Sequence, residues 1–178
     1  MYLTAEKDLV RFAEYSSPFG VVLIAGGESG ITDLSLTGDR PAFTDGLRRK
    51  CGCRPREDND FFKEAFALLD TYFSGAPVEF TLPVDLVGTA FEMKVWQAIR
   101  DIPWGQTRTY GEVAAAIGSP GAARAVGGAC GKNPVPLIVP CHRVVGSNGS
   151  PGGYTGGLEI KKTLLRIEGS LSRPRKGR

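Results

Sequence analysis

Cys141 and His142 are neighbours in the segment IVPCHRVVG, residues 138–146, and His142 is the only histidine in the chain. A free cysteine thiol has a pKa of about 8.5, so only a few per cent of it is ionised at neutral pH. A histidine within reach can take the thiol proton, which makes the sulfur a strong nucleophile. The pair is therefore a candidate nucleophile and base, unless the single histidine stands beside a cysteine by chance.

A histidine that acts as a base needs a carboxylate that orients its ring and stabilises its charged form. Residues 88–178 hold five carboxylates, at Glu92, Asp101, Glu112, Glu159 and Glu168. Two of these, Glu92 and Glu112, belong to helix-capping patterns. Neighbouring side chains in an extended segment point to opposite faces, so we expect either a sharp turn at Pro140 or a water molecule between Cys141 and His142.

The first half of the chain has the pattern of a small α/β module. Three short runs rich in β-branched and apolar residues predict strands over 9–15, 19–26 and 30–38. The polar segment 38–58 is expected to be a loop. Apolar residues at helical spacing predict a helix within 58–77, which Asp58 or Asp60 can cap. We therefore expect one domain over residues 1–75 and an extended connector over 76–87.

Capping patterns divide the second half, residues 88–169, into helices. The segment TAFE is a capping box in which the Thr89 hydroxyl accepts from a first-turn amide and Glu92 reaches back, so a helix should begin there. The segment TYGE, residues 109–112, repeats the pattern and predicts a second helix over 110–118. A third is expected after it, with Ser119 as its N-cap and Pro120 in its first turn. Two short helices this close together are typical of a helix-turn-helix.

The third of these helices is made almost entirely of small residues. They are Ala122, Ala123, Ala125, Gly127, Gly128 and Ala129, and Arg124 alone projects among them. A helix that fills a core needs large side chains, whereas small ones suit a helix that lies close against a nucleic acid backbone. A tightly packed pair of helices would also explain the pattern.

Composition and charge narrow the class of protein. The chain has 178 residues, of which 42% are hydrophobic and 23% charged, as in ordinary globular proteins. We find no signal peptide and no apolar run long enough to cross a bilayer, so we expect an intracellular protein. Residues 1–87 carry nine Lys and Arg against 14 Asp and Glu, and residues 88–178 carry 13 against five, so the net charges are −5 and +8. The basic half suggests a phosphate-rich partner, although surface charge without function would give the same numbers.

Cys51 and Cys53 form a C-x-C pattern that needs a separate interpretation. A disulfide is rare in an intracellular protein, and a zinc site would need further ligands that a chain with one histidine hardly offers. Reduced cysteines in a loop are therefore the expectation.

The second half closely resembles the O6-alkylguanine-DNA alkyltransferases, also called methylated-DNA–protein-cysteine methyltransferases. The resemblance rests on IPWGQTRTYGEVAAAIG, on ARAVGGACGKNPVPLIVPCHRVVGSNG with its central PCHRV, and on GYTGGLEIKKTLLRIEG. It covers residues 88–169 almost continuously. It implies an α/β (α+β) protein: a small ribonuclease H-like domain of β-sheet and helix, then a mostly helical domain with a helix-turn-helix.

The resemblance also implies a reaction, in which an alkyl group moves irreversibly from O6 of guanine in double-stranded DNA to Cys141. It implies a relay from Cys141 through water to His142 and Glu168, with Asn133 supporting the turn that carries the cysteine. Whether O4-alkylthymine is a second substrate stays open. No cofactor and no metal are implied, and we expect a monomer that does not bind membranes, in the cytoplasm or, in a eukaryote, the nucleus.

The resemblance assigns further residues to the handling of a base that must leave the duplex to react. Arg124 would fill the space left by the base, and Tyr110 would assist its rotation and protonate the departing guanine. The Cys141 and Val144 carbonyls would accept from its exocyclic amine. The remaining positions near the base are Cys130, Pro136, Tyr154, Thr155 and Lys161. Cys130 is a departure, since the family often has a larger apolar residue there, and this change bears on which alkyl groups fit.

Two other functions remain to be separated from this one. A cysteine hydrolase would need an oxyanion hole and would regenerate its thiol after each turnover. A DNA-binding protein that senses alkyl lesions without chemistry would need no nucleophile. The basic segment 170–178, with Arg and Lys in SRPRKGR, is expected to be disordered and to add at most weak attraction to DNA.

Overall fold

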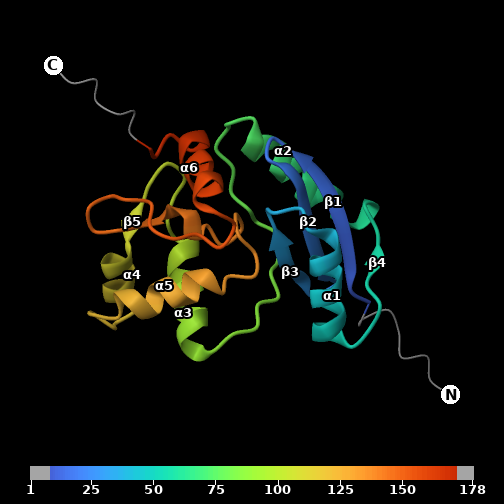
Figure 1. Cartoon of the computed structure of the whole chain (residues 1–178), viewed down its shortest axis with the longest axis horizontal. Helices are drawn as coiled ribbons and strands as arrows, with labels where there is room; N and C mark the ends of the chain where they lie inside the picture. Colours follow the sequence, from blue (N-terminus) through green and yellow to red (C-terminus); the bar gives the residue numbers. More distant parts are fainter. Residues whose placement is uncertain (1–8, 172–178) are drawn as a thin grey trace.

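The computed structural model describes residues 9–171. In Figure 1 a β-sheet with its helices forms one part of the molecule, and a group of further helices forms the other. The sheet has the strand order β3 (Gly30–Ser35), β2 (Gly20–Gly27), β1 (Arg11–Ser17) and β4 (Arg56–Glu57). Most of the basic segment 170–178 lies outside the described residues. The predicted α/β architecture, a sheet domain followed by a mostly helical part, is confirmed.

The three long strands follow the predicted runs closely. Strands β1 (Arg11–Ser17), β2 (Gly20–Gly27) and β3 (Gly30–Ser35) are antiparallel, and the short β4 (Arg56–Glu57) runs parallel to β1. Successive side chains of a strand point to opposite faces. The paired Ala13 and Ile24 accordingly face the main core, whereas the next pair, Phe12 and Ala25, packs against Leu47 on the opposite face.

The predicted loop over 38–58 is wrong, because it contains helix α1 (Arg40–Cys51). The helix has clear end signals: the Asp39 carboxylate accepts from the Ala42 amide at 3.0 Å, and Gly52 ends it with a left-handed φ of 64°. Its apolar pattern is weak, since Leu47 is its one fully buried residue among the twelve. Hydrophobic periodicity therefore missed it.

The expectation of reduced Cys51 and Cys53 is also wrong, because the structure joins them in a disulfide. The left-handed turn at Gly52 brings their Cα atoms to 5.2 Å, within the range that disulfides span. The prediction of reduced cysteines rested on the rarity of disulfides in intracellular proteins, and the left-handed turn at Gly52 could not be predicted from the sequence.

Helix α2 (Lys63–Phe73) follows a 3₁₀ turn, Asp60–Phe62, and covers the main-core face of the sheet. The Asp58 carboxylate accepts from the Phe61 amide at 3.2 Å, as the capping pattern predicted. The connector then returns past the sheet, where Val84 bridges Ile31.

The second half contains α3 (Ala90–Arg100), α4 (Tyr110–Ala116), α5 (Ala123–Gly131) and α6 (Leu158–Ile167). A two-stranded parallel ribbon, β5 (Arg108–Thr109) with β6 (Val144–Val145), ties the middle of this half together. Both predicted capping boxes are present; in the first, Glu92 accepts from the Thr89 amide at 2.8 Å.

Helix α5 starts later than predicted. Neither Ser119 nor Pro120 begins it, because Gly121 adopts a left-handed φ of 93° that no α-helix continues through. One side of α5 packs into the core through Val126 and Ala129, while Arg124 remains exposed. The small residues therefore serve the helix pair on one side and leave an open surface on the other.

The main hydrophobic core is continuous between the two halves. It includes Ile24 and Tyr72 of the first half and Trp96 and Val144 of the second. The sheet domain is thus fixed against the helices that carry Cys141. None of the helices in residues 9–171 is long and apolar enough to span a membrane.

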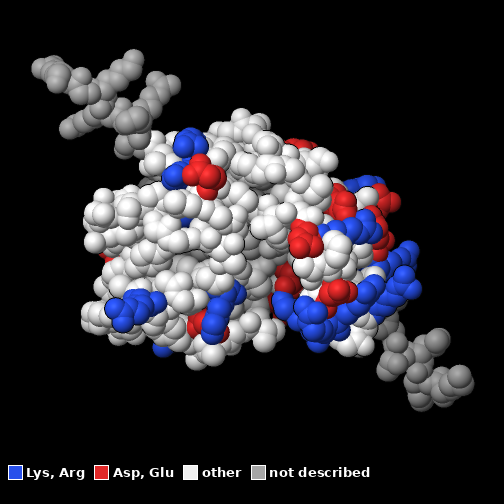
Figure 2. Space-filling view, viewed as in Figure 1, with Lys and Arg blue, Asp and Glu red and all other residues white. Residues whose placement is uncertain are grey.

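Charged side chains of both signs gather over the sheet domain in the view of Figure 2, and fewer lie over the helices of the second half. Many of them are paired: Arg40 contacts Glu14 at 2.8 Å and Glu57 at 2.6 Å, and Lys50 contacts Asp33. Positive charge on α1 is therefore largely balanced by its own neighbours.

Candidate active site

Cys141 lies on a single 3₁₀ turn, Cys141–Arg143 (η3), that begins directly after Pro140. The Cys141 amide donates to the Val139 carbonyl at 2.8 Å, and the Arg143 amide donates to the Pro140 carbonyl at 2.9 Å. The chain thus turns sharply at Pro140, but the turn does not join Cys141 to His142, which share no hydrogen bond within the described residues. A water molecule between them, the second alternative from the sequence, stays a proposal.

His142 is completely buried, and its Nε2 lies 2.6 Å from Glu168 Oε1. An ionised carboxylate can only accept, so Nε2 carries the ring proton and Nδ1 keeps a free lone pair. Nδ1 is buried and has no hydrogen-bond partner among residues 9–171. The unpaired nitrogen is therefore the one that can accept a proton.

Glu168 sits at the C-cap of α6, where a helix dipole disfavours a negative charge. Arg143 compensates: its Nε donates to Glu168 Oε2 at 2.8 Å and its Nη2 donates to Oε1 at 3.1 Å. The Tyr72 hydroxyl, on α2, donates to Oε1 at 2.8 Å. Sequence reasoning missed both Arg143 and Tyr72; the basic residue beside the lone histidine was the only available signal.

Burial and charge set the protonation of this group. Burial alone would raise the pKa of Glu168, but the hydrogen bonds and charges of His142 and Arg143 together lower it to about 2. Burial lowers the pKa of His142, against the opposing effect of Glu168. Burial raises the pKa of Cys141, against the effects of Asn133 and Lys161. At neutral pH the resting state is thus a thiol, a neutral imidazole and a carboxylate.

Asn133 shapes the turn and contacts the sulfur directly. Its Nδ2 donates to Cys141 Sγ at 3.1 Å and to the Val139 carbonyl at 2.7 Å, and its Oδ1 accepts from the Val135 amide at 3.1 Å. Leu137, inside the same turn, has a φ of 76°, a conformation that costs energy in a residue other than glycine. The asparagine therefore holds a strained turn closed around the thiol.

Cys141 opens into a cavity of about 540 Å³. The predicted residues that line it are Tyr110, Arg124, Cys130, Tyr154 and Thr155. A smaller cavity of about 230 Å³ adjoins Cys141 from the side of Pro136 and Asn133. Cys130 borders both cavities, and burial, followed by the charge of Cys141, raises its pKa to about 12.

The glycine-rich loop before α6 borders the cavity through Gly153, Tyr154 and Thr155, whereas no residue of α6 lines it. The Lys161 ammonium is buried, donates to the Val144 carbonyl at 2.6 Å and lies 5.8 Å from the centre of the Tyr110 ring. The Val144 carbonyl, expected to accept from a bound base, thus already has one partner. The backbone at Gly152 passes close to Tyr110, since an added Cβ would lie 3.1 Å from the Tyr110 hydroxyl.

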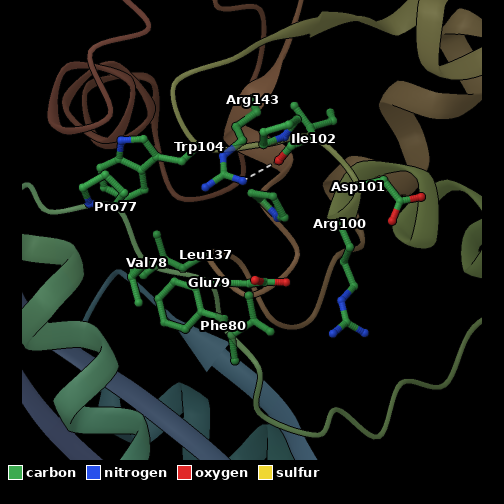
Figure 3. Close-up of a pocket in the computed structure, with 13 residues that line it drawn as sticks. Pro77, Val78, Glu79, Phe80, Arg100, Asp101, Ile102, Trp104, Leu137 and Arg143 are labelled. Atoms are coloured by element: carbon green, nitrogen blue, oxygen red, sulfur yellow. Dashed lines mark hydrogen bonds between the residues drawn. The ribbon is translucent and has the colours of Figure 1, made fainter.

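A separate cavity of about 530 Å³ lies between the connector and the end of α3 and does not include Cys141 (Figure 3). The Arg143 guanidinium reaches its edge, where Nη1 donates to the Ile102 carbonyl at 2.6 Å. The same guanidinium thus joins the Glu168 carboxylate to the end of α3.

The arrangement suits nucleophilic chemistry by a buried thiol on a ligand held in the cavity. Asn133 can stabilise the developing thiolate, and the neutral His142 with its ionised Glu168 can take up the proton. Arg124, exposed on α5 at the rim, marks the side from which a large ligand would enter.

Comparisons with known proteins cover both halves of the chain. Two family models match the chain: the ribonuclease-like domain of 6-O-methylguanine DNA methyltransferase over residues 10–86, and the DNA-binding domain of the same protein over residues 90–170. Together they cover most of the described residues.

Relatives and solved structures match along most of the chain. The methylated-DNA–protein-cysteine methyltransferase of Mycobacterium leprae is 44% identical over 90% of this chain and 93% of its own, and that of Methanosarcina acetivorans is 43% identical over 89% and 98%. A crystal structure of Mycobacterium tuberculosis OGT in complex with DNA has a TM-score of 0.77 and 41% identity, over 90% of this chain and 93% of that one. This chain therefore belongs to the methylated-DNA–protein-cysteine methyltransferase family.

Proposed function

We propose that the protein repairs double-stranded DNA by transferring an alkyl group from O6 of guanine to the sulfur of Cys141. DNA repair by alkyl transfer to a cysteine is the activity of its family. The observation that carries the assignment to Cys141 is the buried His142–Glu168 pair beside a thiol that opens into a cavity.

The reaction needs a proton to leave the thiol before or during attack. In our proposal a water molecule carries it from Cys141 to Nδ1 of His142, the buried nitrogen without a protein partner. The sulfur then forms a bond to the alkyl carbon as the bond from that carbon to O6 breaks. The bonding electrons stay on the guanine, which takes up one proton, so the charges balance.

Residues of the cavity have distinct proposed tasks. The alkylated base leaves the duplex to reach Cys141, and Arg124, exposed at the rim, fills the space that it vacates. Tyr110 supplies the proton to the departing guanine; burial raises the pKa of its hydroxyl, so it remains protonated at neutral pH. The base pocket is lined by Cys130, Pro136, Tyr154 and Thr155. Val144 and Lys161, the other predicted positions, line neither cavity and are joined to each other by a hydrogen bond of 2.6 Å.

Two consequences follow from the chemistry. A thioether is a poor leaving group, so each chain acts once, and it does so as a monomer in our proposal. The bacterial and archaeal sources of the relatives favour the cytoplasm over the nucleus as its location.

The test is to mix the protein with an excess of duplex DNA that carries one O6-methylguanine and to count the guanines restored. We expect repair to stop at one guanine per chain, and Cys141→Ser to restore none while it still binds the lesion. Continued repair beyond one per chain would indicate a turnover enzyme instead. Tight binding by the unaltered protein without any repair would indicate a lesion sensor.

A further inference from the structure

Tyr72 brings a hydroxyl from the sheet domain to the proton relay of the other domain. It lies on α2, 96 positions before Glu168 in the chain, and is completely buried. Its hydroxyl oxygen is 2.8 Å from Glu168 Oε1 and 3.3 Å from His142 Nε2. Packing alone would be served equally well by a phenylalanine, which has no polar group to bury.

We propose that Tyr72 is a positioning residue for thiol activation. Its hydroxyl sets how strongly the Glu168 carboxylate attracts the protonated ring of His142. The inference rests on the proposed function, because it concerns the same relay. It gives the sheet domain a direct part in the chemistry in addition to its packing role.

The geometry of the carboxylate explains the effect. Glu168 Oε1 accepts from His142 at 2.6 Å, from Tyr72 at 2.8 Å and from Arg143 at 3.1 Å. Donors that share one oxygen compete for its negative charge, so the Tyr72 hydroxyl weakens the attraction of Oε1 for the imidazolium. It thereby keeps His142 ready to pass its proton on.

The Tyr72 ring is held so that its hydroxyl cannot turn away. The ring packs edge-on against Trp104 at 5.2 Å and against Phe73 at 5.3 Å, and lies tilted against Phe80 at 5.8 Å. Burial and the charge of Glu168 raise the pKa of Tyr72 far above its usual value, so the hydroxyl remains a donor.

The other groups that face the His142–Glu168 pair come from the second half of the chain. Arg143 on η3 and Lys161 on α6 lower the pKa of His142 by their charge. Cys141 and Tyr154 are neutral in the resting state, since burial raises the pKa of each. Within residues 9–171, Tyr72 is the polar contact that the sheet domain makes with this pair.

The expected sign follows from the competition at Oε1. Without the Tyr72 hydroxyl, more charge remains on that oxygen, the imidazolium is held more tightly and the pKa of His142 rises. A more acidic phenol at position 72 donates more strongly, so it lowers the pKa of His142. A hydrogen bond of ordinary strength corresponds to a shift of roughly half to one pH unit.

The test uses the full chain without a histidine tag. Because His142 is the only histidine, isotope-labelled histidine gives one ring signal, whose titration by NMR is read directly. The samples are the unaltered chain, Tyr72→Phe, and a chain with 3-fluorotyrosine at position 72. The control is Tyr15→Phe, which removes a hydroxyl bound to the Asp70 carboxylate at 2.7 Å, in the same domain.

We expect the pKa of His142 to rise in Tyr72→Phe, to fall with fluorotyrosine and to stay unchanged in Tyr15→Phe. The pH at which alkyl transfer slows on the acid side should shift in the same directions as the pKa of His142. At neutral pH the Nε2 proton signal should move downfield in Tyr72→Phe and upfield with fluorotyrosine, which gives a second reading if the titration falls below the range of the folded protein.

Identical histidine signals in all samples would overturn the inference, as would a shift in one direction in both Tyr72 samples, which would indicate packing only. If Tyr72→Phe fails to fold, the fluorotyrosine sample decides by itself. The titration needs no DNA, so its failure is separate from a failure of the unaltered protein to repair O6-methylguanine.

Discussion

Asn133 holds the sulfur of Cys141 and the carbonyl of Val139 with one amide nitrogen, at 3.1 Å and 2.7 Å. The same side chain therefore forms the turn and stabilises the thiolate that the turn carries. Both effects depend on one residue and can be separated by measuring stability and reactivity together.

Asn133→Ala should slow alkyl transfer and raise the pKa of Cys141, because the thiolate loses a donor. The Val135 amide loses its partner and the Val139 carbonyl loses one of its two, which should lower the free energy of unfolding by about 1–3 kcal/mol. Reaction with O6-benzylguanine against pH and urea unfolding measure the two effects. Asn148→Ala, in an exposed turn, is the control, and an Asn133 variant no slower than this control would contradict the account.

Glu168→Gln should destabilise the protein in a pH-dependent way. The pKa of Glu168 is about 2 in the folded protein against an ordinary 4.5, so its charge contributes stability above pH 4.5 that is lost as the pH falls toward 2. The variant leaves Arg143 buried without its partner, which costs about 3–5 kcal/mol. We expect the difference in free energy of unfolding between the variant and the unaltered protein to be largest at pH 7 and to become smaller below pH 4.5.

Urea unfolding at a series of pH values measures this difference. Glu159→Gln, whose carboxylate pairs with Lys162 on the exposed side of α6, is the control and should show a small effect. A difference for Glu168→Gln that is the same at every pH would show that its charge is not what stabilises the fold.

Arg124→Ala should lower the rate on O6-methylguanine in duplex DNA by at least about tenfold and leave the reaction with free O6-benzylguanine nearly unchanged. The side chain lies at the rim of the cavity, where it can act on the duplex but is not needed once a base is inside. Single-turnover rates on both substrates test this. Arg166→Ala removes an exposed guanidinium on α6 as a control for general charge; equal losses on both substrates in Arg124→Ala would remove the proposed role.

Cys130→Met should reduce the transfer of benzyl groups more than that of methyl groups. Cys130 borders both cavities that meet at Cys141, so a longer side chain takes up the space that a bulky alkyl group needs. The ratio of benzyl to methyl transfer rates is the measurement, with Cys130→Ala expected to keep or increase it. An unchanged ratio in both variants would show that alkyl size is limited elsewhere.

Local signals predicted much of the fold. The capping boxes at Thr89 and Thr109 marked the starts of α3 and α4 because their hydrogen bonds join residues three apart. Helix α1 was not predicted, because it buries little beyond Leu47 and so has no clear hydrophobic periodicity. The start of α5 was misplaced because the left-handed backbone of Gly121 cannot be read from a residue name.

The candidate site was only partly predictable for a similar reason. Cys141 and His142 could be predicted because they are neighbours in the sequence. Glu168 could be predicted only from the resemblance to a family. Tyr72 reads as one more apolar position of α2, because its partner lies 96 residues further along the chain. Arg143 likewise gives no local sign that its guanidinium compensates the Glu168 carboxylate.

The assignment of Cys141 as the alkyl acceptor is tested most directly by finding which residue receives the alkyl group. The protein is incubated with duplex DNA that carries O6-methylguanine, and its intact mass and its peptides are then measured by mass spectrometry. We expect one added methyl per chain, on the peptide that contains Cys141, and none in Cys141→Ser. A methyl on Cys130, or on any other residue while Cys141 stays unmodified, would contradict this assignment.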